Sequence, residues 1–200
     1  VEGLQENVIK KILLYACEKD PCLAIELLSY EMVRHLLSCD DDRNNTALMM
    51  ACQYQPMVVA EIFKYKDKGN DNQDMTESDK RSDSSNVDSS TLNMTNNDGD
   101  TALMIACRYQ PLAAIEILKY VEDGGGSDSA GRDTLNMKNK DGWTALMLAC
   151  QFQPLVTVEI LRYEEGMNTL NMKNNNGWTA LMIACQHQPL ADIEILKHKE

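Results

Sequence analysis

The sequence predicts an all-α solenoid, a stack of short helical units without a common centre, and two observations lead to this fold class. First, one string recurs along the chain: Ala-Cys, three residues, Pro, four residues and Glu. It occurs five times, with its cysteines at Cys17, Cys52, Cys107, Cys150 and Cys185. Second, these copies take up all five prolines and five of the seven cysteines. Units this short bury their apolar faces only against their neighbours, so a stack of five units is expected.

The spacing of the copies defines the units and the inserts between them. Successive cysteines are 35, 55, 43 and 35 residues apart, so two junctions carry about 20 and about 8 additional residues. We expect one domain over residues 1–200, with units at about 7–36, 37–66, 91–121, 134–166 and 169–200. Residues 67–90 are polar and serine-rich, and residues 122–133 are rich in Gly, Ser and Asp. These compositions predict two flexible inserts.

The fourth unit shows why each copy is expected to begin with a short helix, which we call helix A. Thr144 is a suitable N-cap residue. Leu146, Ala149 and Cys150 then fall on one face at i, i+3 and i+4, which is the spacing of a buried helix face. Helix A is therefore expected to end near Phe152.

A second helix, helix B, is expected to start at Pro154 and to end near Tyr163. Proline suits the first turn of a helix, where its missing N–H has no partner to lose. Leu155, Val158, Ile160 and Leu161 are expected to give this helix a broad buried surface. Each unit therefore reads as a helix-turn-helix.

The segment between helix B and the next helix A is predicted to form a hairpin-like loop. It is polar, with Leu170 as its one apolar anchor before the fifth unit. Asn176-Gly177 is a strong signal for a tight turn. We call this loop, in each unit, the finger.

These units resemble the ankyrin repeat. DGWTALMLACQFQPLVTVEILRY, Asp141 to Tyr163, is similar to the family pattern DGxTPLHLAAxxGHLxxVxxLLxxG. TLNMKNKDG, Thr134 to Gly142, is similar to the finger sequence, where VNAKDxDG is usual. The tetratricopeptide repeat has a similar period but two longer helices and no finger, so it fits poorly. The resemblance covers nearly all of the chain outside the two inserts and implies an ankyrin-repeat solenoid.

Two positions depart from the family pattern in every unit but the first. Ala stands where the family has Pro, at Ala47, Ala102, Ala145 and Ala180. Met stands where the family has the His of helix A, at Met49, Met104, Met147 and Met182. We expect apolar packing by the flexible thioethers in place of the hydrogen bonds that the His would make.

The composition indicates an intracellular, cytoplasmic domain. The chain has 19 basic and 31 acidic residues, for a net charge of −12. This charge argues against nucleic acid or an anionic membrane as a general partner. No apolar stretch is as long as a membrane span.

The cysteines and histidines predict no disulfide, metal site, cofactor or catalytic centre. Five cysteines occupy the same place in successive units, too far apart for disulfides, and no CxxC pair is present. We call these five equivalent cysteines the cysteine ladder. Cys22 and Cys39 lie outside it, and their role stays open. The three histidines, His35, His187 and His198, lie in different places, and no nucleophile motif is found. The chain is therefore expected not to be an enzyme.

The resemblance implies a concave groove lined by finger tips and by the exposed end of helix A. Two places in each unit match the groove positions of the family: the residue after the finger glycine and the pair after Ala-Cys. These places hold both tryptophans of the chain, and an aromatic residue or His recurs at the second residue of the pair in four successive units. The candidate partner-binding residues are Asn45, Gln53, Tyr54, Asp100, Arg108, Tyr109, Lys140, Trp143, Gln151, Phe152, Trp178, Gln186 and His187. Aromatic residues and Arg dominate interface hot spots. The alternative interpretation is that these rings brace neighbouring fingers and helices.

The sequence therefore predicts a non-catalytic module that binds a protein or peptide partner in the concave groove. Two alternatives stay open: a regulatory or targeting domain of a larger enzyme, and a self-associating structural array. We expect a monomer, although an uncapped last unit would allow self-association. Fold alone does not identify the partner.

Overall fold

The computed structural model describes residues 2–30, 33, 35–64, 89–123 and 130–187. Within these residues the structure is helical, and the only bridge between extended residues pairs Asp40 with Thr46. The helices are α1 (Glu2–Lys19), α2 (Pro21–Ser29), the 3₁₀ helix η1 (His35–Ser38), α4 (Ala47–Tyr54), α5 (Pro56–Lys64), α6 (Ser89–Asn93), α7 (Ala102–Tyr109), α8 (Pro111–Glu122), α9 (Ala130–Asp133), α10 (Ala145–Phe152), α11 (Pro154–Ile160), α12 (Glu164–Asn168) and α13 (Ala180–His187). The predicted all-α fold class is confirmed.

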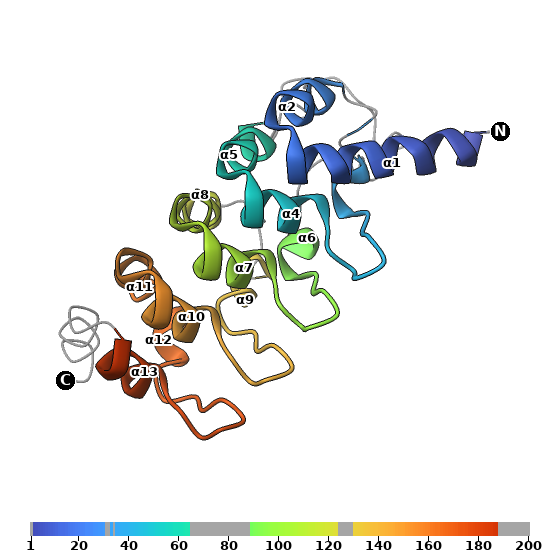
Figure 1. The fold of residues 1–200 in the computed structure, drawn as a ribbon. Coiled ribbons are helices and arrows are strands. Elements are labelled where there is room, and N and C mark those ends of the chain that lie inside the picture. Colours follow the sequence, from blue (N-terminus) through green and yellow to red (C-terminus); the bar gives the residue numbers. More distant parts are fainter. Residues whose placement is uncertain (1, 31–32, 34, 65–88, 124–129, 188–200) are drawn as a thin grey trace, which may run out of the picture.

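The helices form two parallel rows, and each helix contacts the equivalent helix of the next unit (Figure 1). The A helices α1, α4, α7, α10 and α13 make the inner row. The B helices α2, α5, α8 and α11 make the outer row on the opposite side from the fingers. The fingers project from the A helices on one side of the stack. This is the expected solenoid.

Capping explains the boundaries of helix A. Thr46, Thr101 and Thr144 each precede an A helix, and each hydroxyl accepts a hydrogen bond of 3.3 Å from the amide three residues later. Such caps satisfy an amide that has no partner within the helix. At the other end of helix A a single glutamine separates the two helices, and the proline that follows it is the first residue of helix B. The expected cap at Thr144 and the expected end at Phe152 are confirmed.

Helix B of the fourth unit ends at Ile160, earlier than the predicted end near Tyr163. Two contacts fix the course of the chain after this helix, one with the preceding unit and one within the fourth unit. The Tyr163 hydroxyl donates to the Leu118 carbonyl of the preceding unit at 2.9 Å. Gly166 lies against the Ile160 carbonyl so closely that no side chain would fit there. The chain therefore leaves the helix axis after Ile160 and forms the short helix α12.

The buried interior runs along the stack rather than collecting in one place. The ladder cysteines Cys17, Cys52, Cys107 and Cys150 are fully buried, whereas Cys185 in the last helix is exposed. The methionines that stand in place of the family His are also fully buried at Met49, Met104 and Met147. Met182, at the equivalent place in α13, is 50% exposed. The expected thioether packing is thus present in the three middle units.

The ends of both expected inserts are helical. Glu122 is the last residue of α8, and residues 130–133 form α9. Ser89 and Ser90 begin α6, which contacts α9. Leu92 and Leu135 just beyond are buried, so apolar anchors fix these short helices to the stack. The remaining parts of the inserts, 67–88 and 124–129, lie outside the described residues.

Candidate functional site

Each finger turns around one Asn or Asp side chain. In the second finger the Asn96 Oδ1 accepts hydrogen bonds from the Asp98 and Asp100 amides, both at 2.9 Å. The same arrangement recurs at Asp41, Asn139 and Asn174. A side-chain acceptor of this kind replaces backbone partners in a tight turn. Sequence reasoning missed this residue, although its fixed distance from the finger turn in four units was a usable signal.

The Asp41 carboxylate accepts three hydrogen bonds within the first finger. Partial burial alone would raise the pKa of this carboxyl group. The hydrogen bonds from Asn45 and from the Arg43 amide outweigh that effect, and the pKa of Asp41 lies below its ordinary value. The carboxylate is therefore occupied by the turn and is no candidate acid or base.

Backbone hydrogen bonds join the fingers into one continuous body. The Asn97 amide donates to the Arg43 carbonyl at 2.9 Å, and the Lys140 amide donates to the Asp98 carbonyl at 3.0 Å. The Asn175 amide repeats the pattern, donating to the Asp141 carbonyl at 2.9 Å. The surface that the fingers present is thus preorganised, which lowers the entropy lost on binding.

Two of the candidate residues, Asn45 and Asp100, take part in the hydrogen bonds that join neighbouring fingers. Asn45 accepts from the Asn96 side chain at 3.0 Å, and Asp100 accepts from the Asn139 side chain at 2.7 Å. Asp100 is 3% exposed and also faces Arg108, whose Nη1 lies 3.5 Å from its Oδ2. These two residues hold neighbouring fingers together and position Arg108.

A hollow of about 390 Å³ lies between the first two fingers and the helices α4 and α7. It brings together five of the candidate residues, which come from different units: Asn45, Gln53, Asp100, Arg108 and Tyr109. Arg43, Asn96, Asn97, Asp98 and Ile105 complete its lining. The hollow is therefore mostly polar, with one ring at its border.

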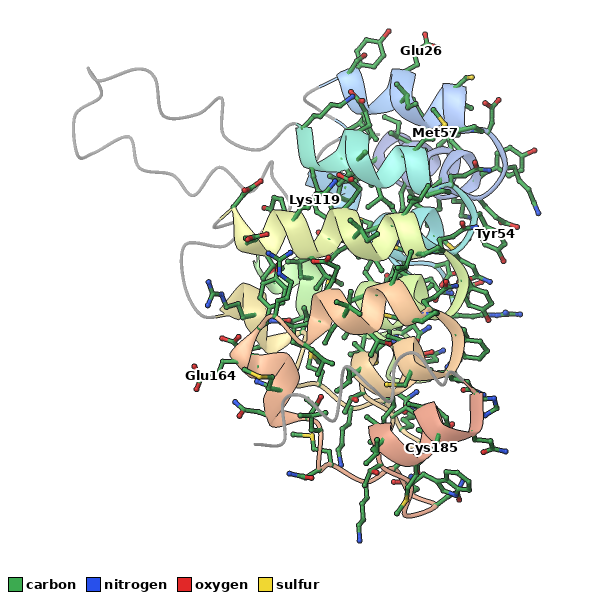
Figure 2. The ribbon with its side chains drawn as sticks, turned by 90° about the vertical axis from the view of Figure 1, so that its left-hand side faces the viewer. Glu26, Tyr54, Met57, Lys119, Glu164 and Cys185 are labelled. Atoms are coloured by element: carbon green, nitrogen blue, oxygen red, sulfur yellow. The ribbon has the colours of Figure 1, made fainter. Side chains whose placement is uncertain are left out.

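The rings at the ends of the A helices form an exposed column. Tyr54, Tyr109 and Phe152 occupy equivalent places in α4, α7 and α10 and are 41%, 47% and 41% exposed. Figure 2 shows Tyr54 on the right-hand edge of the stack, where α4 ends. Lys19 Nζ lies 5.8 Å from the centre of the Tyr54 ring, and Arg108 Cζ lies 6.0 Å from that of Tyr109. Cations thus already lie near two of the rings.

The other candidates differ in how far they reach the surface. Trp143 is half-buried against the core, which agrees with a bracing role. Trp178 is 40% exposed. Of the polar candidates, Gln151 is half-buried, whereas Lys140, Gln186 and His187 are exposed. None of these six residues lines the hollow.

The described residues offer little for catalysis or metal binding. Burial raises the pKa of the Cys17 thiol to about 12, and it raises the pKa of Cys52 and Cys107 as well. Thiols with such raised pKa values are poor nucleophiles. Within the described ranges, no three His, Cys, Asp or Glu side chains lie close enough together to hold a metal ion.

Comparison with family models decides the affiliation. A model of three ankyrin repeats matches residues 13–133 and again residues 128–200. The chain belongs to the ankyrin-repeat family. Ankyrin repeats are generally protein–protein interaction modules and are typically non-catalytic. A comparison with curated proteins finds no match. Among the helices of the described residues, none combines the length and apolar character that crossing a membrane requires.

Proposed function

We propose that this ankyrin-repeat domain is a non-catalytic recognition module that binds a protein or peptide partner across its concave face. The partner would lie over the hollow between the first two fingers and over the exposed ring column. Cofactors play no part in this function. The identity of the partner is set by the surface chemistry rather than by the fold.

The observation that carries the proposal is the exposure of Tyr54, Tyr109 and Phe152 in three successive units. Aromatic side chains of this size are usually buried, and a row of exposed rings beside a polar hollow is a typical interface feature. The fingers beside the rings are fixed by backbone hydrogen bonds. A rigid surface with aromatic anchors meets the main requirements of a hot spot.

The reduced cysteines support a place inside the cell. All seven lie within the described residues and are thiols rather than disulfides. Thiols persist in reducing compartments, where disulfides are rare. We therefore place the function in the cytoplasm or another reducing compartment.

The test is affinity capture with the purified chain, followed by mass spectrometry and titration of each captured protein. We expect Tyr109→Ala and Phe152→Ala each to weaken binding by about 1 to 4 kcal/mol, because hot-spot rings contribute in that range. Tyr30→Ala is the matched control, since Tyr30 is 53% exposed and lies outside the column. Equal binding by all three variants at unchanged helical content would disprove a role for the column.

A further inference from the structure

Each of three successive units exposes a large aliphatic side chain directly after the first proline of helix B. Met57 is 72% exposed, Leu112 is 65% exposed and Leu155 is 73% exposed. The residues that follow them in the same helices, Val58, Ala113 and Val156, are fully buried. The stack therefore does not need these three side chains for its core, although they recur in register.

Each aliphatic residue lies across the turn from an exposed ring. The ring is the last residue of helix A, and the aliphatic residue is the second residue of helix B, three positions later. We call the six residues Tyr54, Met57, Tyr109, Leu112, Phe152 and Leu155 the turn strip. Figure 2 shows Tyr54 and Met57 toward the right-hand side of the stack, whereas Lys119 of α8 lies farther to the left. Exposed apolar side chains that recur in register in this way mark a candidate interaction site.

The repeat distance of the strip matches one peptide conformation well. Neighbouring A helices contact one another, and so do neighbouring B helices, which places equivalent side chains about 8 to 10 Å apart. A polyproline II helix presents equivalent side chains every three residues, or about 9 Å. A β-strand presents them every two residues, or about 7 Å, and loses register with the strip.

An amphipathic helix has a similar spacing over two turns but needs an apolar groove. The hollow beside the rings is lined by Arg, Asn and Asp side chains and does not supply one. Polyproline II ligands dock between aromatic side chains such as those of the ring column, and their carbonyls have no internal partners. Gln53, Arg108 and Gln151 directly precede the three rings and carry N–H donors for such carbonyls.

The net charge of the chain favours a different, basic partner over a second copy of this chain as the occupant of the strip. Glu61, Glu116 and Glu159, each four residues after a strip aliphatic, are already paired with a basic residue three positions later, so any attraction comes from the charge of the whole chain. The chain as a whole carries a net charge of −12. A second copy would bring the same charge, whereas a segment with basic residues would be attracted.

Resting on the proposed recognition function, we infer that the turn strip binds a proline-rich segment of the partner in the polyproline II conformation. This segment carries an apolar side chain at every third residue and basic residues between them. Tyr54, Tyr109 and Phe152 receive the apolar side chains, while Met57, Leu112 and Leu155 close the outer edge of the site.

The experiment uses fluorescence anisotropy with the full chain and three labelled synthetic peptides. One peptide repeats Pro-Lys-Leu, the second has the same composition in scrambled order, and the third is a lysine-leucine peptide stapled as a helix. We expect the first peptide to bind best. Leu112→Ser and Tyr109→Ala should each weaken its binding at least about fivefold, since a hot-spot contact contributes more than 1 kcal/mol. Val8→Ser is the matched control, because Val8 is 52% exposed on α1, away from the strip.

Three results would overturn the inference. The scrambled or stapled peptide could bind as well as the repeating one, or Val8→Ser could weaken binding as much as Leu112→Ser. Light scattering could also show a dimer that Leu112→Ser dissociates, so that a second copy covers the strip. Failure here leaves the proposed function intact if captured partners still depend on Tyr109 and Phe152 but not on Leu112.

Discussion

The cysteine after Ala lies on the buried face of helix A in the first four units. Cys52 and Cys107 are fully buried, and burial raises the pKa of both thiols, with a further contribution from the neighbouring cysteines of the ladder. Cys185 has the same sequence environment but is exposed. Cysteines at the same position of the unit therefore differ in exposure, and the packing around each unit decides how reactive its thiol is.

Thiol labelling of the folded protein should divide the cysteines into three groups. We expect Cys22 and Cys185, which are exposed, to react first, and the half-buried Cys39 to react more slowly. The buried Cys17, Cys52, Cys107 and Cys150 should react only after denaturation, because reagent and water do not reach them. The measurement is labelling at fixed times followed by peptide mass spectrometry. Immediate labelling of Cys107 would contradict the stacked register.

Stability should fall at alkaline pH through the same thiols. Burial raises the pKa of Cys52 and Cys107 above their ordinary value of 9.0, so the folded state keeps these protons longer than the unfolded state. Their contribution is complete below about pH 9 and is lost as the pH rises, by up to about 1.4 kcal/mol per pH unit and thiol. Urea unfolding between pH 8 and pH 10 measures this loss. The double variant Cys52→Ala, Cys107→Ala should lose less, and an unchanged slope would refute the assignment.

The boundaries of the A helices could be predicted from sequence because local residues set them. Thr144 caps the start of α10, and the Gln-Pro pair ends it, so no tertiary information is needed. The end of α11 could not be predicted in this way. It depends on the hydrogen bond from Tyr163 to the Leu118 carbonyl of another unit. The short helices α6 and α9 were missed because they depend on contact with each other.

The exposure of the candidate residues could be predicted from sequence for some positions and not for others. The resemblance indicated the positions after the finger glycine and after Ala-Cys, and among them Tyr54, Tyr109 and Phe152 are exposed. It did not reveal that Asp100 is buried under Arg108 and Asn139, since that depends on the next finger. The expectation that Leu155 and Val158 are buried was wrong, since they are 73% and 37% exposed, whereas Ile160 and Leu161 are fully buried as expected. The exposed aliphatic row at Met57, Leu112 and Leu155 was missed because each residue looks like core in a helix B pattern.

The finger glycines allow a matched test of contact between fingers. Gly142 and Gly177 both have a φ near +80°, which disfavours any side chain. A Cβ at Gly142 would also lie 2.9 Å from the Asn175 amide nitrogen, whereas a Cβ at Gly177 would meet nothing within 4 Å. We expect Gly177→Ala to cost about 1 kcal/mol and Gly142→Ala clearly more, because the latter also displaces the next finger. Thermal unfolding of the two variants gives the comparison, and equal costs would contradict the finger contacts described.

The stack transmits structural effects from neighbour to neighbour. α7 contacts α4 on one side and α10 on the other, and α8 contacts α5 and α11 in the same way. Stability in such an array is approximately a sum of unit terms and interface terms. A defect in the middle is therefore expected to affect the adjacent units most.

A charge placed in the middle of the ladder tests this behaviour. Cys107 is fully buried, so Cys107→Asp would bury an uncompensated carboxylate at a cost of about 3 to 5 kcal/mol, whereas Cys107→Ala should cost about 1 kcal/mol or less. Hydrogen exchange followed by mass spectrometry should show the largest loss of protection in α7, a smaller loss in α4 and α10, and the smallest in α1. Cys22→Asp, on the exposed surface of α2, is the control and should leave protection unchanged. If Cys107→Asp lowered protection equally in every helix, the chain would behave as one cooperative core, and the nearest-neighbour description of the stack would be wrong.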